Sequence, residues 1–193
     1  MSRWNARPGR LMALPALAAI AWVAVGLAVF GAIGGIYGQF EEPIKEELAA
    51  QIKQHPAQLE GQGEEAEEVA IPTGGSLDEQ ASAVAEEAWT RLKFFHGHGL
   101  SMVLASFVAL TLIANAKMGD RLRAWLTWVG LASMTLYNVG WFFAGILVPW
   151  KGLEGAKEFG EFLFFVPFGV ITVVVWVIVL VVWAKEALNP ETA

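Results

Sequence analysis

The chain has 193 residues, of which 55% are apolar, including nine Trp and 12 Phe, whereas only 17% are charged. This composition lies far outside that of soluble proteins and indicates a protein of the lipid bilayer. The absence of cysteine excludes disulfides, iron–sulfur clusters, thiolate metal sites and covalently attached c-type haem. The length argues against several domains, so a single membrane domain spanning residues 1–193 is expected.

The net charge of -6 is distributed unevenly along the chain. Four basic side chains lie within residues 37–93: Lys45, Lys53, Arg91 and Lys93. The carboxylates of the same segment are Glu41, Glu42, Glu46, Glu47, Glu60, Glu64, Glu65, Glu67, Glu68, Asp78, Glu79, Glu86 and Glu87. The rest of the chain is therefore mildly basic and has no basic stripe, so nucleic acid is not expected as a partner.

Residues 11–36 form the first long apolar run. The run is longer than the core of a secretory signal, which has roughly 7–15 residues, and it is long enough for a membrane span of about 20 residues. Gly31, Gly34, Gly35 and Gly38 form overlapping small-xxx-small steps. Such steps let another helix, or a flat cofactor, approach the backbone closely, and helix packing is the favoured interpretation.

Residues 37–93 are expected to form an acidic, partly helical extramembrane loop. The dipeptide Glu42–Pro43 predicts the start of an amphipathic helix that Pro56 ends. The composition of residues 61–68 favours disorder. The sequence from Ser76 to Glu79 fits a capping box and predicts a helix continuous with the next span. The acidic run could chelate cations weakly, but it lacks the spacing of an EF-hand, and a solvated charged segment is the favoured interpretation.

Three further apolar runs predict membrane spans over residues 94–116, 124–148 and 162–184. We expect Pro149 to end the third span and Pro167 to kink the fourth. Residues 151–160 should form a short polar connection. The predicted fold class is therefore an all-α integral membrane four-helix bundle with one extramembrane loop.

Basic residues in the short flanking segments predict the orientation of this bundle. One side collects Arg3, Arg7, Arg10, Lys117, Arg121, Arg123 and Lys185, whereas the other short loop has only Lys151 and Lys157. Both termini should therefore be cytoplasmic, with the acidic loop outside, in a bacterial inner membrane. The expected outer-interface aromatics are Tyr37, Phe40, Trp89, Phe94, Trp141 and Trp150, and the expected inner ones are Trp125, Trp128 and Trp183.

The sequence from Phe94 to Met102 places two of the three histidines, His96 and His98, at the mouth of the second span. A titratable, metal-capable side chain at membrane depth is costly and is a functional-site hypothesis by default. At 1.5 Å rise per residue, His98 should lie about 6 Å inside the span. Residues two apart on a helix differ by about 200°, so we expect His98 to point inward, above Met102, and His96 to face the interface or water.

Three interpretations of these histidines are open. His98 could ligate the iron of haem b, with glycines of neighbouring helices giving the porphyrin room. His96 and His98 could instead bind copper or zinc, together with Met102 or the outer carboxylates. A structural histidine that caps the helix start, or bonds across helices, is the third. No second membrane-depth histidine can complete a haem site, so the sixth ligand would be Met102, Met134, an unusual ligand or a partner chain.

The stretch His98–Gly99–Leu100–Ser101–Met102–Val103 resembles the His-Gly-Leu-x-Met stretch of haem–copper oxidase subunit I, whose histidine near the outer end of the second helix ligates the low-spin haem. The layout is similar to that of short four-span bacterial membrane proteins related to subunit I. This resemblance implies that His98 is the haem-ligand position and His96 its flanking partner. The chain lacks the later histidines for copper and the second haem, and the acidic loop is an insertion, so oxygen reduction is not implied.

Asn138 is the other polar residue at depth, expected roughly two turns deeper than His98. An interhelical hydrogen bond worth about 0.6 kcal/mol is its default role. The spans lack a buried Asp, Glu, Lys or Arg for coupled ion transport. The sequence also has no nucleophile–base pair, phosphate loop or HExxH motif, so we expect no catalysis by the chain on its own.

Two functions remain open. The first is a small haem- or metal-binding membrane protein, centred on His98, for electron transfer or sensing. The second is a non-catalytic four-span subunit or scaffold whose loop, residues 41–93, docks a partner protein. Besides the bilayer and that partner, a second copy of the chain is an expected binding partner.

Overall fold

The computed structural model describes residues 10–56, 59 and 75–188, and within these residues the chain is helical, with short turns and no strand. The elements are α1 (Arg10–Lys53), α3 (Leu77–Asn115), α4 (Asp120–Ile146), α5 (Val148–Gly160), the π-helical segment η3 (Glu161–Phe165) and α6 (Val166–Leu188). The predicted all-α class is confirmed. The expectations for Arg3, Arg7 and the acidic run 61–68 fall outside the described residues.

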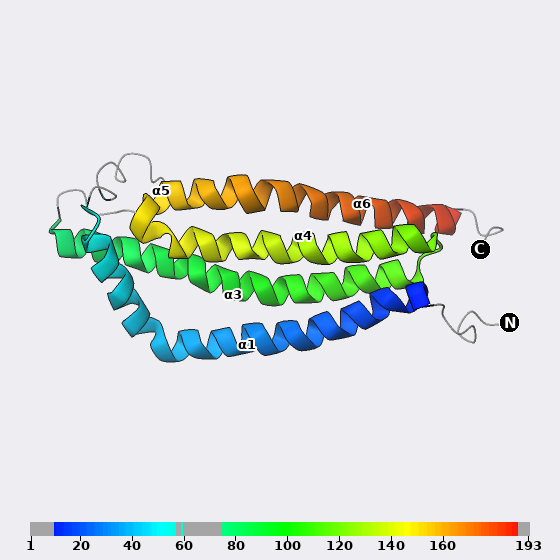
Figure 1. The fold of residues 1–193 in the computed structure, drawn as a ribbon, viewed down its shortest axis with the longest axis horizontal. Coiled ribbons are helices and arrows are strands. Elements are labelled where there is room, and N and C mark those ends of the chain that lie inside the picture. Colours follow the sequence, from blue (N-terminus) through cyan, green and yellow to red (C-terminus); the bar gives the residue numbers. More distant parts are fainter. Residues whose placement is uncertain (1–9, 57–58, 60–74, 189–193) are drawn as a thin grey trace.

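The long helices run side by side, and the start of α1 lies at the same end of the molecule as the end of α6 (Figure 1). Helix α1 packs on α3, α3 on α4, and α4 on α6. Within the described residues, the helical stretches long and apolar enough to cross a membrane are Pro15–Lys53, Leu77–Asn115, Asp120–Ile146 and Val148–Leu188. Four such stretches suggest a multi-pass membrane protein, and α3 and α4 lie at its centre.

Most of the described part of the expected loop is helix rather than loop. The sequence signal for the start of α3 is confirmed: the Glu79 backbone N–H donates to the Ser76 hydroxyl, and the Ser76 N–H donates to the Glu79 carboxylate. From this capping box α3 continues without interruption to Asn115, so residues 77–93 and the predicted second span form one helix. The end of α1, residues 41–53, packs against residues 77–93 of α3.

Helix α1 bends where its sequence turns from apolar to acidic. The backbone of Phe40 is non-helical (φ -118°, ψ 19°), and Pro43 follows three residues later. Proline removes one backbone donor and its ring clashes with the carbonyl four residues earlier, which kinks a helix. The bend turns residues 41–53 toward the start of α3 (Figure 1).

The connection expected over residues 151–160 is helix α5, which is kinked at Gly152 with φ 71°. Pro149 stands in the first turn of α5, because α4 already ends at Ile146. The chain makes a π turn just before α6, two residues ahead of Pro167. There the Val166 N–H donates to the carbonyl of Glu161, five residues earlier.

The helical head consists of residues 41–53, residues 77–93 and α5, and it has its own apolar core. Trp89, which we expected at the outer interface, is fully buried in this core and contacts Tyr37 at a ring-centroid distance of 4.8 Å. The buried core residues are Leu48, Ala49, Ile52, Ala81, Val84, Ala85, Ala88, Trp89, Leu92, Val148, Leu153 and Ala156. The head is therefore a packed unit continuous with the long helices.

A second apolar core lies toward the other end of the bundle and joins α1, α3, α4 and α6. Its buried members include Leu110, Leu126 and Val175. The basic turn between α3 and α4 is closed by Arg123, whose guanidinium is buried and contacts the Asp120 carboxylate at 2.7 Å and the Ala116 carbonyl at 2.9 Å.

Candidate functional site

The histidine stretch lies on a regular part of α3, so His96 and His98 project to different neighbours. The ring of His96 lies against α1: a Cβ added at Gly34 would be 2.5 Å from its Cε1 atom. Tyr37 lies next to it, with ring centroids 6.4 Å apart, and the His96 Nδ1 atom is buried without a hydrogen-bond partner among the described residues. The expectation that His96 faces the interface or water is therefore wrong.

His98 lies on the α4 side of α3 and is half-buried. Its ring stacks on Trp141 at a centroid distance of 5.3 Å and an interplanar angle of 24°. The ring of Phe94 meets His98 edge-on at 5.6 Å. His98 is thus part of an aromatic cluster between α3 and α4.

Met102 faces a third environment, a cavity of about 230 Å³ between α1, α3 and α4 that we call the central cavity. The central cavity is lined by Trp22, Val25, Gly26, Val29, Phe30, Phe95, Gly99, Met102, Met134, Thr135, Asn138 and Val139, and by neither histidine. Within the described residues no group of three His, Asp or Glu side chains could hold a metal ion. Among the described residues, His96, His98 and Met102 therefore do not converge on one metal ion or on the two axial positions of one haem iron.

Asn138 makes the expected interhelical bond, because its Nδ2 atom donates to the Phe95 carbonyl at 3.1 Å. It therefore lies near the level of His98, not two turns deeper opposite Leu104 and Ala105. The difference arises because α3 begins well before residue 94 and the end of α4 packs against the helical head. The Asn138 Oδ1 atom is buried and has no partner among the described residues.

The four glycines of α1 do not form one packing seam within this chain. Gly34 contacts His96, whereas a Cβ added at Gly31, Gly35 or Gly38 would meet nothing within 4 Å among the described residues. Within the described residues no other helix packs closely against these three glycines, and their role in helix packing stays a prediction. The closest helix contact involving a glycine backbone is elsewhere: a Cβ at Gly145 would lie 2.9 Å from the Ala88 carbonyl oxygen.

A larger pocket of about 460 Å³ lies where the helical head meets the long helices, and we call it the junction cleft. It is lined by Glu87, Arg91, Phe94, Tyr137, Trp141, Ala144, Lys157, Glu161, Phe165 and Val166. Two of these residues, Phe94 and Trp141, are the ring partners of His98. The histidine stretch therefore supports the aromatic wall of this cleft.

Sequence reasoning missed the charged members of the junction cleft. Arg91 is mostly buried and spans three elements: it contacts the Glu87 carboxylate at 3.1 Å and the carbonyls of Ala144 and Leu153 at 3.3 and 2.7 Å. One feature of the sequence could have indicated this role: Arg91 lies about one turn before Phe94 and Phe95, which begin the second predicted span. Lys157 and Glu161 gave no signal, because the polar connection was not expected to be helical.

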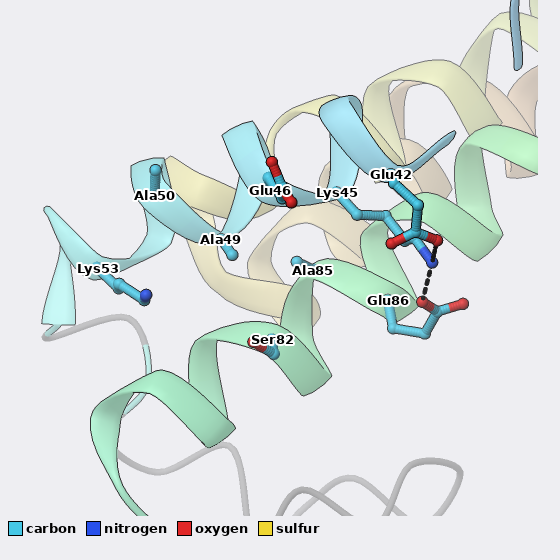
Figure 2. A pocket seen from close by; sticks show the side chains of 9 residues that line it. All are labelled: Glu42, Lys45, Glu46, Ala49, Ala50, Lys53, Ser82, Ala85 and Glu86. Carbon is cyan, nitrogen blue, oxygen red and sulfur yellow. Dashed lines mark ion pairs between the residues drawn. The ribbon is translucent and has the colours of Figure 1, made fainter. Parts of the chain in front are cut away.

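A third pocket, the head groove, lies between the bent end of α1 and the start of α3 (Figure 2). Its volume is about 520 Å³, and its lining residues are Glu42, Lys45, Glu46, Ala49, Ala50, Lys53, Ser82, Ala85 and Glu86. The exposed carboxylate of Glu46 makes no ion pair with the described residues. The groove therefore has a small apolar floor and a charged rim.

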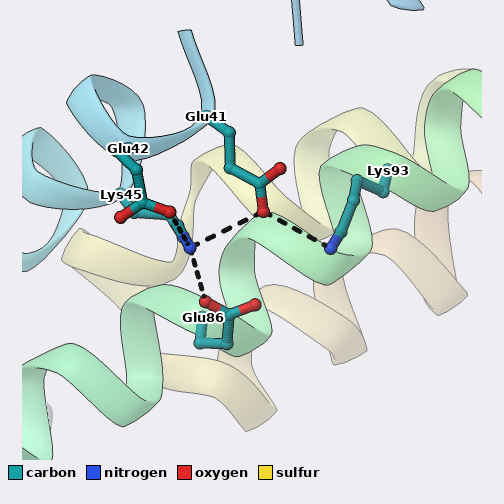
Figure 3. A network of polar contacts seen from close by, with 5 residues as sticks. All are labelled: Glu41, Glu42, Lys45, Glu86 and Lys93. Carbon is teal, nitrogen blue, oxygen red and sulfur yellow. Dashed lines mark ion pairs between the residues drawn. The ribbon is translucent and has the colours of Figure 1, made fainter. Parts of the chain in front are cut away.

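A network of ion pairs links the two walls of the head groove (Figure 3). The Lys45 ammonium lies 2.7 Å from Glu42, 3.1 Å from Glu86 and 3.6 Å from Glu41. Glu41 also pairs with Lys93 at 3.8 Å, and Lys53 pairs with Asp78 at 2.9 Å. Since Lys45 and Glu86 lie on different helices, the network fixes the angle of the bent segment.

No protein-family model, curated protein or solved structure matches this chain.

Proposed function

We propose that this protein is a multi-pass membrane protein without catalytic machinery of its own, which presents an ordered acidic head to a partner protein with a basic surface. The observation that carries the proposal is the apolar core of the helical head, because it holds the acidic segment in a defined shape. A fixed surface with an excess of one sign of charge favours docking of a complementary partner.

The outer helices support insertion in a bilayer. In the most apolar windows of the α1 and α5–α6 stretches only 11% of the residues are buried, against 33% for α3 and 39% for α4. Exposed apolar residues lie on several sides of α6, among them Val166, Val170, Val173, Val174 and Val177. A helix that is apolar all round and little covered by protein is typical of a membrane span.

The charge of the head supports a basic partner. The head has ten carboxylates and six basic side chains, a net charge of -4, and the whole of residues 37–93 carries a net charge of -9. The basic flanks at the other end of the bundle favour an orientation with this head outside the cytoplasm. In a bacterial inner membrane the partner would therefore be an extracytoplasmic protein, or the extracytoplasmic part of a membrane protein.

The test is site-specific photo-crosslinking in membranes from the native host. A photoreactive residue at Glu46, on the head groove, should give an adduct whose crosslinked peptide is rich in Lys or Arg. The same residue at Trp128, exposed at the far end of α4, is the control and should not give that adduct. Raised salt, or the charge reversals Glu42→Lys and Glu79→Lys, should reduce the yield; an adduct insensitive to both would contradict the proposal.

Haem or metal binding at His98 is the alternative, supported by the resemblance of residues 98–103 to the haem-ligand stretch of subunit I. Because the donors of one chain diverge, a six-coordinate haem or a metal site with several protein ligands would need a ligand from another molecule, whereas a five-coordinate haem needs His98 alone. The visible absorption spectrum of the purified protein tests it. A Soret band present in the wild type and lost in His98→Ala would support haem, a colourless wild type would exclude haem, and elemental analysis of the purified protein would test zinc or copper.

A further inference from the structure

The junction cleft has two chemically different walls. Its charged residues lie on α3, α5 and η3: Glu87, Arg91, Lys157 and Glu161. Its aromatic part belongs to the long helices: Phe94, Tyr137, Trp141 and Phe165. The volume of about 460 Å³ falls within the range of roughly 300–1,000 Å³ for small-molecule sites. Such a cleft suits a molecule with a charged end and an apolar body.

The cleft has two basic and two acidic side chains, and two of these four make no ion pair with the described residues. Arg91 and Glu87 satisfy each other, and Arg91 also binds two carbonyls. Lys157 and Glu161 stand four residues apart, yet within the part of the chain that the structure describes neither makes an ion pair or a side-chain hydrogen bond. The cleft therefore offers one ammonium group and one carboxylate to a ligand.

The π turn of η3 places these charges beside the aromatic wall. A π turn contains one more residue than a turn of α-helix. Because each residue of a helix corresponds to a rotation of about 100°, the extra residue rotates α5 relative to α6 by about that angle. Glu161 begins η3, and Phe165 ends it. Phe165 packs against Tyr137 and Trp141 at centroid distances of 5.4 and 4.8 Å. Single π turns inside helices are frequent at functional sites.

We propose that the junction cleft binds a phospholipid with a zwitterionic phosphoethanolamine headgroup. Lys157 binds the phosphate, Glu161 accepts hydrogen bonds from the primary ammonium, and the start of the acyl chains lies along Phe94, Trp141 and Phe165. The same headgroup chemistry exists in soluble glycerophosphoethanolamine, but the aromatic wall would then stay in contact with water. The inference rests on the membrane insertion proposed above.

The charge pattern discriminates among headgroups. A primary ammonium donates charge-assisted hydrogen bonds to a carboxylate, whereas a trimethylammonium has no N–H to donate. An anionic headgroup without an amine would leave Glu161 facing a second negative charge, which disfavours it. Phosphatidylethanolamine is therefore expected to bind in preference to phosphatidylcholine and phosphatidylglycerol with the same acyl chains.

Native mass spectrometry of the full chain, released from nanodiscs with equal amounts of these three lipids, tests the inference. Ion pairs at partly exposed sites support an enrichment of phosphatidylethanolamine over phosphatidylcholine of about fivefold. Glu161→Gln should abolish this preference, and Lys157→Gln should reduce retention of all three lipids. Glu154→Gln and Lys151→Gln are matched controls, because both residues are exposed on α5 outside the cleft, and they should retain the wild-type preference.

Three results would overturn the inference. These are equal retention of phosphatidylethanolamine and phosphatidylcholine, a preference for phosphatidylglycerol, or displacement of the bound lipid by an equal concentration of glycerophosphoethanolamine. Extraction of the membranes with alkaline carbonate distinguishes a failure of the lipid-binding inference from a failure of the proposed function. A chain that resists carbonate but shows no headgroup preference leaves membrane insertion intact, whereas a chain released by carbonate contradicts both.

Discussion

Arg91 connects the head to the rest of the molecule. It contacts a carbonyl in the last turn of α4, Ala144, and one in α5, Leu153, while its own helix supplies the Glu87 carboxylate. The final carbonyls of a helix have no intrahelical partner, and a cation at this end is favoured by the helix dipole. One side chain thus joins three helices near the junction cleft.

Replacing Arg91 by Ala should destabilise the fold by about 1.5–3 kcal/mol, the usual range for hydrogen bonds to a charged group. The measurement is the free energy of unfolding in detergent, followed by circular dichroism. Lys93→Ala is the matched control, because Lys93 is exposed and its distance to Glu41 is 3.8 Å; its effect should stay within about 0.5 kcal/mol. Equal effects of the two substitutions would show that the carbonyl contacts of Arg91 contribute nothing.

Lys45 gives the head a defined pH response. It lies beyond the kink that ends the apolar part of α1, and its hydrogen bonds with Glu42 and Glu86 raise its pKa above the ordinary value of 10.5. A folded-state pKa above the unfolded value stabilises the fold fully below pH 10.5, and this stabilisation is lost as the pH rises through the folded-state pKa.

The variant Lys45→Gln should therefore be less stable than the wild type by a constant amount between about pH 7 and pH 9. The difference should shrink only above pH 10.5. Paired thermal melts over this range measure it. A difference that disappears already at about pH 9 would mean that the Lys45 pairs of the structure do not form in solution.

The histidines show how far residue-level prediction reaches. Their spacing of two predicted that His96 and His98 face different directions, and the structure agrees. The spacing could not predict which neighbour each would meet, because that depends on where α1 and α4 lie around α3. His96 contacts α1 only because Gly34 leaves room for its ring.

At the scale of elements, α3 and α4 cross closely at Gly145, where α4 meets the part of α3 that belongs to the head. A Cβ on Gly145 would lie 2.8 Å from the Leu92 Cγ atom and 2.9 Å from the Ala88 carbonyl oxygen, and a backbone atom cannot move aside as a side chain can. Gly145→Ala should therefore destabilise the protein by about 1–3 kcal/mol, the usual cost of overpacking. The measurement is the shift of the thermal unfolding midpoint.

Gly35→Ala is the control for this substitution. Gly35 also lies in a helix, but a Cβ there meets nothing within 4 Å among the described residues. Alanine should then stabilise α1 by about 0.5–1 kcal/mol, because glycine is the poorer helix former. Should Gly35→Ala be the more damaging of the two, a partner in the membrane must cover that face of α1.

The elements that could be predicted are those with strong local signals. The capping box at Ser76 set the start of α3, and Pro43 marked the change of direction in α1. Helix α5 was missed, because its glycines and charges resemble a loop and its burial depends on Leu153 and Ala156 joining a core formed mainly by other helices. The π turn was missed because only its hydrogen-bond pattern defines it, and no residue type marks that pattern.

At the scale of the whole molecule, the sequence predicted the four long apolar helices but not their arrangement. A span that is apolar all round has no preferred inner face, so α6 carried no signal that it would pack on α4. The structure places α3 and α4 at the centre, with α1 and α6 on the outside. The exposed apolar surface of the two outer helices is compatible with a lipid environment.

The most direct test of the account is the accessibility of single cysteines in intact cells, which is simple because the chain contains none. A membrane-impermeant maleimide should label Ser82→Cys on the head from outside and Gly119→Cys, in the turn before α4, only after permeabilisation. Val174→Cys, on the exposed face of α6, should stay unlabelled until the protein is denatured in SDS. Labelling of Val174→Cys as fast as Ser82→Cys without detergent, or of Ser82→Cys and Gly119→Cys from the same side, would contradict a four-span protein with its acidic head outside.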